Sequence, residues 1–207
     1  MTEQRLLLAT SNRGKVRELK KLLRGLPLKI ESLDRYPEFG KYRETGKTFE
    51  DNSRGKCLYY SQKYSGLVLA EDSGLEVEAL GGQPGVYSAR FSGPGANDQK
   101  NIKKLLKLLA AVPGARRRAC FVCVASLGCR GRIIRTFRGR VRGLILTEPD
   151  GHNGFGYDPV FYYPPLKKSF ARLRPEEKNL VSHRGRALKK VRLFLEHFLK
   201  NKQPDYK

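Results

Sequence analysis

The chain has 207 residues, enough for one large domain or for two closely packed lobes with a substantial core. It carries 42 lysine and arginine residues against 20 aspartate and glutamate residues, and the net charge of +22 favours anionic partners without choosing among nucleotides, nucleic acid and anionic membranes. No apolar stretch reaches the roughly 18 residues of a membrane span, so no membrane partner or membrane-spanning helix is expected.

Met1–Gln4 lead directly into a strand-like run, so no targeting segment is expected and a reducing, cytoplasmic setting is the default. In the N-terminal half, apolar runs and helical spacing predict strands and helices in alternation. They are a strand at Leu6–Ala9, a helix capped by Thr10–Asn12 that ends before Pro27, a strand at Leu28–Leu33, a helix at Thr48–Tyr64 and a strand at Leu67–Glu71.

The C-terminal half contains two long glycine- and proline-rich loops between regular elements. The predicted segments are a loop at Gly81–Gly95, a helix at Asp98–Leu109, a hairpin of Arg118–Leu127 and Arg132–Ile145 around Gly128–Gly131, a loop at Pro149–Asp158, a strand at Val160–Tyr163 and a helix at Arg186–Lys200. No internal repeat is visible. Helices and strands intermix and one hairpin is evident, which predicts a mixed α/β sheet.

The segment Ala70–Gly74 places two adjacent carboxylates, Glu71 and Asp72, where a buried strand is predicted to meet a loop. Neighbouring side chains on a strand point to opposite faces, so the two carboxylates should have different surroundings. A carboxylate at a buried strand end is costly unless it meets a metal, a cation or hydrogen-bond donors. Metal-assisted phosphate chemistry is one interpretation, and a strand-to-turn junction capped by Asp72 and Ser73 is the other.

Two further segments suit an anionic ligand. Thr10–Lys15 lies between the first strand and the first helix, where free backbone N–H groups bind phosphate, although the glycine spacing of a Walker A loop is absent. Lys56 lies on the second predicted helix, and Glu44 lies in the loop before it. With Asp72, Glu44 could supply hard oxygen ligands for magnesium, which typically takes one or two carboxylates plus substrate phosphates. A solvated acidic loop is the alternative for Glu44.

The later part of the chain holds two polar, loop-like segments and a Cys-x-x-Cys pair. Phe155 lies between glycines and can stack on a planar ring, with Asp158 near enough to bond a base edge. Lys178–Arg184 clusters hydrogen-bond donors in a predicted polar loop. Cys120 and Cys123 resemble half a zinc site, but they lie in a strand-like run that turns them to opposite sides, so small buried residues are the better account.

Five motifs in order identify a resemblance that covers about Leu6 to Leu199. They are Ala9–Leu19, Glu44–Asn52, Asp72–Val77 with its continuation to Arg90, Gly154–Phe161 and Ser182–Leu188. The chain resembles the inosine triphosphate pyrophosphatase family, the bacterial-type enzymes that act on non-standard purine nucleoside triphosphates. The resemblance implies an elongated α/β fold, a mixed twisted sheet flanked by helices. Residues 1–207 would form one domain with two lobes around a central nucleotide cleft, usually as a homodimer.

The resemblance also implies magnesium-dependent hydrolysis of (d)ITP and XTP to the monophosphate and pyrophosphate. Asp72 would be the catalytic proton acceptor, and Glu44 and Asp72 would hold the metal. The substrate-binding residues would be Thr10, Ser11, Asn12, Arg13, Gly14, Lys15, Lys56, Ser73, Phe155, Gly156, Tyr157, Asp158, Lys178, His183 and Arg184. Within this set Thr10, Asn12 and Lys15 would hold the triphosphate with Lys56 nearby, and Phe155 would stack on the base. Asp158, Lys178, His183 and Arg184 would read its edge.

Some residues depart from the family pattern. Glu71 stands where Asp is frequent, and Arg142 and Arg172 replace commonly acidic residues. The high positive charge keeps alternatives open: a related nucleotide pyrophosphatase with another base preference, or a basic nucleic-acid-binding protein on the same scaffold. The basic runs that motivate the latter are Lys103–Lys107, Arg116–Arg118 and Lys167–Lys168. Because such runs are usually solvated faces, only weak electrostatic nucleic-acid binding is expected.

Overall fold

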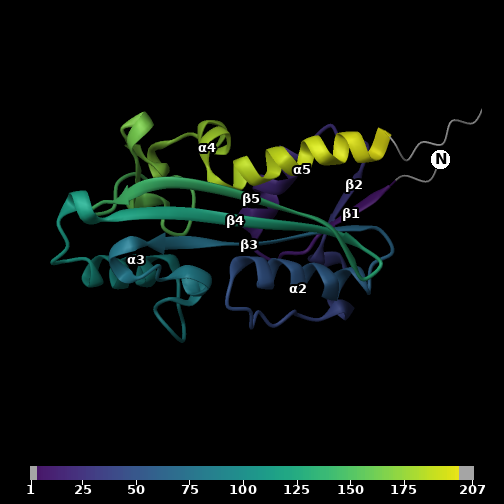
Figure 1. Ribbon diagram of the computed structural model, residues 1–207, viewed down its shortest axis with the longest axis horizontal. Coiled ribbons are helices and arrows are strands. Elements are labelled where there is room, and N and C mark those ends of the chain that lie inside the picture. The colour runs from purple at the N-terminus through teal and green to yellow at the C-terminus, as the bar shows by residue number, and fades with distance from the viewer. Residues whose placement is uncertain (1–3, 201–207) are drawn as a thin grey trace, which may run out of the picture.

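Three long strands run along the long axis of the molecule and form the centre of a mixed sheet (Figure 1). The computed structural model describes residues 4–200, so residues 1–3 and 201–207 of the predicted domain, and most of the predicted Met1–Gln4 lead-in, lie outside the described residues. The long strands are β3 (Leu67–Val77), β4 (Arg118–Cys129) and β5 (Arg132–Ile145). The four short strands are β1 (Arg5–Leu8), β2 (Lys29–Ser32), β6 (Phe161–Tyr163) and β7 (Lys168–Ser169).

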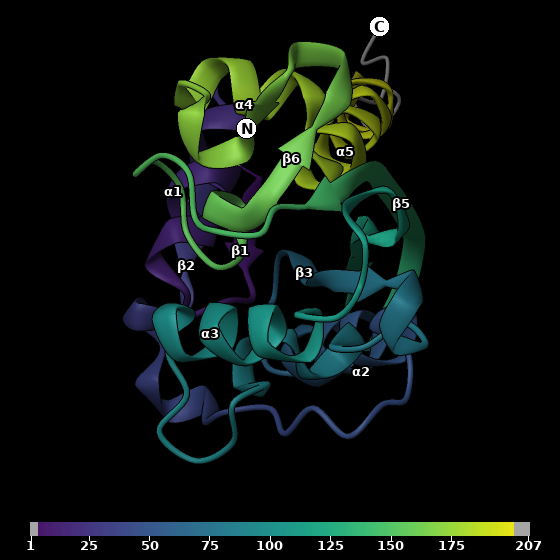
Figure 2. The ribbon, with the colours of Figure 1, turned by 90° about the vertical axis from the view of Figure 1, so that its left-hand side faces the viewer.

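The strand order is β2-β1-β3-β4-β5-β6-β7, with β1 parallel to β2 and β3 and the remaining pairs antiparallel. Within residues 4–200, five helices cover the open sheet: α1 (Arg13–Leu22), α2 (Phe49–Ser61), α3 (Asp98–Leu108), α4 (Pro175–Val181) and α5 (His183–Lys200). Viewed from one end, α4 and α5 lie on one side of β3 and α2 and α3 on the other (Figure 2). The predicted mixed α/β fold is confirmed.

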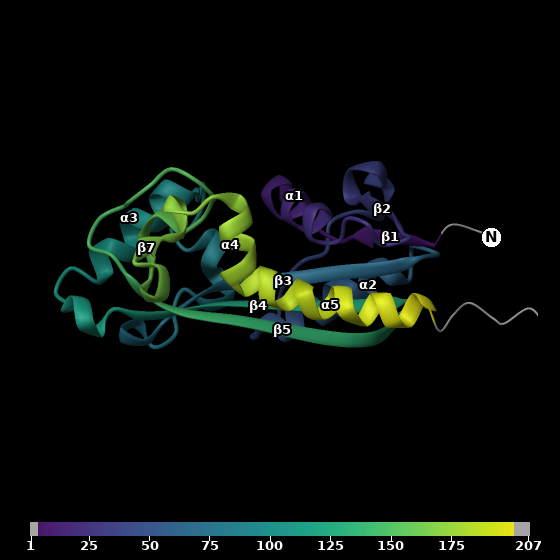
Figure 3. The ribbon, with the colours of Figure 1, turned by 90° about the horizontal axis from the view of Figure 1, so that it is seen from above.

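The first strand shows how the sheet is buried on both faces. Leu6 and Leu8 pack in the core beneath α1 and α5, whereas Leu7 packs in the core beneath α2. The view from above shows α1 and α5 on the same side of the sheet (Figure 3). A strand that is covered on both faces has a continuous run of apolar residues in its sequence, because both alternating sets of side chains are buried. The carboxyl end of β1 therefore lies between the two helical layers, and the chain leads from there into α1.

The predicted strand-to-loop junction at Glu71 is wrong, because β3 continues without a break to Val77. Glu71, Asp72 and Ser73 pair with Ala125, Val124 and Cys123 of β4. Pairing with β4 supplies the backbone hydrogen bonds that a loop would have left open, so residues that favour turns locally are held in mid-strand. The alternation is confirmed: Glu71 faces Arg184 of α5, and Asp72 faces Asn52 of α2.

The predicted polar loop Lys178–Arg184 is also wrong. Lys178 lies in α4, and α5 begins at His183, three residues before the predicted start. Pro175 occupies the first turn of α4, followed there by two glutamates, which suits a helix N-terminus. Ser182 separates the two helices, and its hydroxyl oxygen accepts a hydrogen bond of 3.0 Å from the Gly185 N–H at the start of α5.

The remaining predictions need smaller changes. The β4–β5 hairpin is confirmed, with β4 extending to Cys129 so that the turn is Arg130 and Gly131 alone, both at positive φ. The Gly81–Gly95 loop contains a 3₁₀ helix at Gly85–Arg90. Cys120 and Cys123 are free thiols, and within residues 4–200 no group of three or more His, Cys, Asp or Glu side chains could hold a metal ion. No described helix is long and apolar enough to cross a membrane.

Candidate active site

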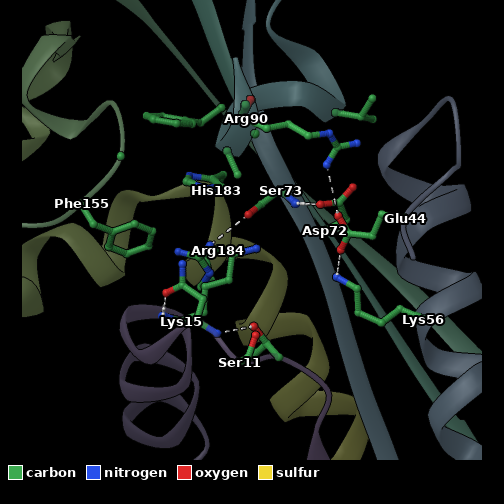
Figure 4. A pocket seen from close by; sticks show the side chains of 18 of the residues that line it. Ser11, Lys15, Glu44, Lys56, Asp72, Ser73, Arg90, Phe155, His183 and Arg184 are labelled. Atoms are coloured by element: carbon green, nitrogen blue, oxygen red, sulfur yellow. Dashed lines mark hydrogen bonds and ion pairs between the residues drawn. The ribbon is translucent and has the colours of Figure 1, made fainter. Parts of the chain in front are cut away.

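A cavity of about 270 Å³ opens at the carboxyl end of β1 and runs along the middle of β3 (Figure 4). It brings together nearly all the predicted site residues from both halves of the chain. Those that line it are Thr10, Ser11, Asn12, Lys15, Glu44, Lys56, Asp72, Ser73, Phe155, Gly156, Tyr157, Asp158, Lys178, His183 and Arg184. Arg13 and Gly14 do not line it. A Cβ on Gly14 would lie 3.3 Å from the Phe155 ring, so Gly14 leaves room for that ring.

Asp72 and Glu44 form an acidic pair on the α2 side of the cavity. One Asp72 oxygen accepts from the Asn52 amide at 3.0 Å, and the other accepts from the Ser73 N–H at 2.9 Å. Burial raises the pKa of the Asp72 carboxyl; Lys15 opposes this shift and Glu44 adds to it. A buried carboxylate with a raised pKa beside a second carboxylate suits proton transfer at a reacting water.

The same two carboxylates fit a hard divalent cation. Two carboxylates meet on this side of the cavity, and magnesium is typically bound by one or two carboxylates with substrate phosphates completing its shell. The Glu44 carboxylate is at present ion-paired with Lys56 on one oxygen and lies 3.9 Å from Arg90 on the other. Burial would raise the pKa of Glu44, but these cations outweigh burial and lower it, so the carboxylate is ionised and available to a cation.

The N-terminus of α1 forms the second wall. The Asn12 side chain caps the helix by accepting the Lys15 N–H at 3.0 Å, and the Thr10 hydroxyl oxygen accepts the Asn12 N–H at 3.3 Å. The Lys15 ammonium lies 3.2 Å from Glu71, and Lys56 donates to the Glu71 carbonyl oxygen at 3.1 Å. Two lysines and the first turn of a ten-residue helix thus face the acidic pair, which is a favourable arrangement for phosphate.

Arg184 connects the two ends of the cavity. Its Nε lies 3.0 Å from both carboxylate oxygens of Glu71, and its two terminal nitrogens donate to Glu18 at 2.6 Å and to Ser73 at 3.0 Å. The side chain is only 2% exposed. Burial alone would raise the pKa of Glu71, but Arg184 and Lys15 hold that pKa well below its usual range. Glu71, whose role the sequence left open, therefore anchors the two cations.

The other end of the cavity presents an aromatic ring to its ligand. The ammonium of Lys178 lies 4.8 Å from the centroid of the Phe155 ring, and the guanidinium of Arg184 lies 5.4 Å from it. One Asp158 oxygen accepts from Lys178 at 2.6 Å and from the Phe155 N–H at 2.8 Å. Asp158 thereby holds the loop that carries Phe155.

His183 enters the cavity from the first turn of α5. Its ring stacks on Phe121, with centroids 4.6 Å apart. Among the described residues its buried Nδ1 has no hydrogen-bond partner. Burial, together with Arg184 and Lys178, lowers the pKa of His183 well below its usual value. Gly139 of β5 permits this placement, because a Cβ there would overlap the carbonyl oxygen of His183. The structure thus holds a neutral imidazole in the cavity wall, with one buried ring nitrogen unpaired among the described residues.

Several residues in the cavity wall or directly behind it were not found from the sequence. Glu18 joins Arg184 to Lys178, at 2.6 and 3.3 Å, and its position one turn beyond Lys15 was the available signal. Asp98, in the first turn of α3, accepts the Gly156 N–H at 2.6 Å and ties the Phe155 loop to the opposite side of the cavity. Arg90 also lines the cavity, from the 3₁₀ helix that the sequence presented as part of a loop.

The fold and the cavity define an α/β protein whose cleft suits a phosphorylated ligand carrying a flat ring. Comparison with known proteins agrees: the model of the Ham1 family matches residues 6–194, and the chain belongs to this family. The predicted resemblance is therefore confirmed, since the curated relatives are named as pyrophosphatases of the expected kind.

Three comparisons give the extent of the similarity. A protein of Desulforamulus reducens named dITP/XTP pyrophosphatase is 48% identical over 90% of this chain and 93% of its own. A Geobacter sulfurreducens protein of the same name is 47% identical over 89% of this chain and 92% of its own. The solved structure of a HAM1 protein from Coxiella burnetii matches with a TM-score of 0.86 at 37% identity, covering 94% of this chain and 99% of that one.

Proposed function

We propose that the protein hydrolyses non-standard purine nucleoside triphosphates, dITP or ITP and XTP or dXTP, to the monophosphate and pyrophosphate. The observation that carries this proposal is the cleft itself. It places the Asp72–Glu44 pair across the cleft from Lys15 and the Phe155 ring. The relatives named dITP/XTP pyrophosphatase, which match about nine-tenths of the chain, support the same reaction.

In this proposal Glu44 and Asp72 would hold Mg²⁺ together with the substrate phosphates. When bound, the cation offsets negative charge on the phosphates and favours formation of a nucleophilic hydroxide. Asp72 takes the proton of the attacking water, since its carboxyl is buried, oriented by Asn52 and raised in pKa. Lys56 neutralises the neighbouring charge of Glu44.

Ligand placement follows the two walls of the cleft. Thr10, Asn12 and Lys15 hold the triphosphate at the α1 N-terminus. Ser11, Arg13 and Gly14 belong to the same turn. Ser73 contacts the substrate from mid-strand. Phe155 stacks on the base while the backbone of its loop, Gly156 and Tyr157, closes that side of the cleft.

Base selection follows from the donors at the Phe155 end. The 6-oxo group of hypoxanthine or xanthine accepts from side chains such as Lys178, His183 and Arg184, with Asp158 holding Lys178 in place. Adenine carries an amino group at that position and would leave those donors unpaired. Each buried unpaired donor costs about 1–3 kcal/mol, enough to disfavour ATP strongly.

We further propose that residues 1–207 act as one catalytic domain whose two lobes meet at this cleft. The single seven-stranded sheet that runs through both ends of the molecule supports this organisation. The resemblance supports a homodimer, and a role in the nucleotide pool supports a cytoplasmic location. Nucleic acid would bind only weakly, through the positive charge.

A substrate panel tests the proposed function. Pyrophosphate release from dITP, XTP, dGTP and ATP is measured at equal concentration with magnesium and again with excess chelator. We expect turnover of dITP and XTP, much slower turnover of dGTP and ATP, and no turnover with chelator. Equal rates for dITP and dGTP would overturn the proposed selectivity. Orthophosphate release in place of pyrophosphate would overturn the reaction.

A further inference from the structure

Arg90 approaches the Asp72–Glu44 pair from the side of the cleft opposite Lys56. It ends the 3₁₀ helix Gly85–Arg90, and its guanidinium lies 3.9 Å from one Glu44 oxygen while Lys56 pairs with the other. Figure 4 shows the two cations approaching Glu44 from opposite sides, with Asp72 beside them. Lys15, at the α1 N-terminus, faces the pair from a third direction.

The guanidinium of Arg90 is held only loosely by the protein. A separation of 3.9 Å is beyond hydrogen-bond distance, and the Arg90 guanidinium makes no hydrogen bond to an acceptor among the described residues. Its other neighbour is the ring of Tyr87, 5.1 Å from the guanidinium carbon, and 45% of the side chain is exposed. Arg184, the other arginine lining the described cleft, uses each of its three nitrogens in a hydrogen bond to Glu71, Glu18 or Ser73, which leaves only the second N–H of each terminal nitrogen for a ligand. Arg90 offers its full planar fork of donors.

The backbone that carries Arg90 is, in contrast, firmly placed. The Asn101 amide donates to the carbonyl oxygens of Ser88 and Ala89, at 3.3 and 3.2 Å. The Tyr157 hydroxyl donates to the same Ser88 oxygen at 2.9 Å, which joins this helix to the Phe155 loop. A fixed Cα with an uncommitted guanidinium allows Arg90 to change partners through side-chain rotation alone.

Glu44 supplies the reason for such a change. Its carboxylate now attracts both Lys56 and Arg90. A divalent cation held by Glu44 and Asp72 would neutralise that carboxylate, and Arg90 would lose its acidic neighbour. Oxygens of a bound polyphosphate would then be the strongest acceptors within reach, and a guanidinium binds such oxygens in bidentate fashion.

We propose that Arg90 binds the pyrophosphate group as it leaves, an inference that rests on the proposed function. In the step, the water oxygen forms a bond to the α-phosphorus and its proton passes to Asp72. The bond from the α-phosphorus to the bridging oxygen breaks, and its electron pair stays with pyrophosphate. Negative charge therefore grows on the leaving group, and donors aimed at it lower the barrier. Arg90 supplies them from the wall opposite the α1 N-terminus.

The kinetic test compares Arg90→Ala and Arg90→Lys with Arg43→Ala. Arg43 is exposed, adjoins Glu44 in sequence and does not line the cleft. Its alanine variant removes the same charge as Arg90→Ala and serves as the matched control. With dITP we expect Arg90→Ala to lower kcat on the order of 100-fold, with a smaller change in KM. Arg90→Lys should recover part of the loss, and Arg43→Ala should match the wild type. Equal losses in the two alanine variants would assign the effect to long-range charge and overturn the proposal.

A binding measurement separates this proposal from the proposed function. Inorganic pyrophosphate is titrated calorimetrically into each protein in the presence of magnesium, after thermal melting has checked that each variant is folded. We expect Arg90→Ala to weaken pyrophosphate binding at least about tenfold, and Arg43→Ala to leave it within about twofold. Unchanged affinity in Arg90→Ala would overturn the assignment. If the wild type fails to cleave dITP, the proposed function fails, and the titration still decides whether Arg90 binds pyrophosphate.

Discussion

Replacing Glu71 by glutamine should destabilise the protein more than any change at a surface ion pair. Glu71 is 1% exposed, and its carboxylate accepts from Arg184 at 3.0 Å and pairs with Lys15 at 3.2 Å. Glutamine keeps the volume and one acceptor oxygen but removes the charge. Arg184, itself 2% exposed, would retain only Glu18 as a charged partner.

The expected loss follows from the cost of leaving a buried charge incompletely paired. Removing one partner of a buried ion pair typically costs about 3–5 kcal/mol. Glu18 is partly exposed and continues to neutralise Arg184, so the lower end, about 3 kcal/mol, applies to Glu71→Gln. The free energy of unfolding of a typical protein is only about 5–15 kcal/mol, so this loss is a large fraction of its stability.

Urea unfolding of wild type, Glu71→Gln and Glu176→Gln measures the difference. Glu176 pairs with Lys21 on the surface, with side chains 62% and 50% exposed, so its replacement should leave the free energy of unfolding almost unchanged. The midpoint of Glu71→Gln should fall at an unchanged denaturant slope. If Glu71→Gln unfolds within 1 kcal/mol of Glu176→Gln, the view of Glu71 as the anchor of Arg184 is refuted.

Three further predictions concern the cleft. Asp72→Asn should lower kcat for dITP by at least about 100-fold while leaving dITP affinity measurable by calorimetry, because it removes the proton acceptor but keeps the volume; an active variant would remove Asp72 from its role. Phe155→Ala should raise the Kd for dITP about tenfold or more and leave that for pyrophosphate unchanged, since stacking contributes about 1–3 kcal/mol per base; equal weakening of both ligands would contradict base stacking. The pKa of His183 is lowered by burial and by Arg184 and Lys178, so the folded state stays unprotonated while the unfolded state gains a proton as pH falls below about 6.5. Wild-type unfolding free energy should therefore fall by up to about 1.4 kcal/mol per pH unit more than that of His183→Asn between pH 6.5 and 5.5, and parallel profiles would show that His183 is not buried in its neutral form.

The sequence predicted those parts of the fold that depend on local pattern. The two-residue period of a strand separated Glu71 from Asp72, and the structure places them on opposite faces of β3. The end of β3 was missed because Asp72, Ser73 and Gly74 favour turns locally, whereas pairing with β4 overrides that preference. The start of α5 was missed for a related reason, because a seven-residue helix, α4, lies just ahead of it and is too short to show a periodic pattern.

The partners of the site residues were harder to predict than the residues themselves. Motif order identified Arg184 and Lys15 but not the carboxylate that joins them. Arg184 and Glu71 are 113 residues apart in the chain, so no local pattern relates them. Glu18 and Arg90 were missed for the same reason. Glu18 lies on a predicted helix and Arg90 in a predicted loop, and neither pattern shows which distant residues these side chains meet.

The position of bond cleavage tests the central claim most directly, namely that the Asp72 centre directs water to the α-phosphorus of a non-standard nucleoside triphosphate. dITP is hydrolysed in ¹⁸O-labelled water with magnesium, and the products are analysed by mass spectrometry. The account predicts one ¹⁸O atom in dIMP and unlabelled pyrophosphate. Label in pyrophosphate, or formation of dIDP with labelled orthophosphate, would contradict it.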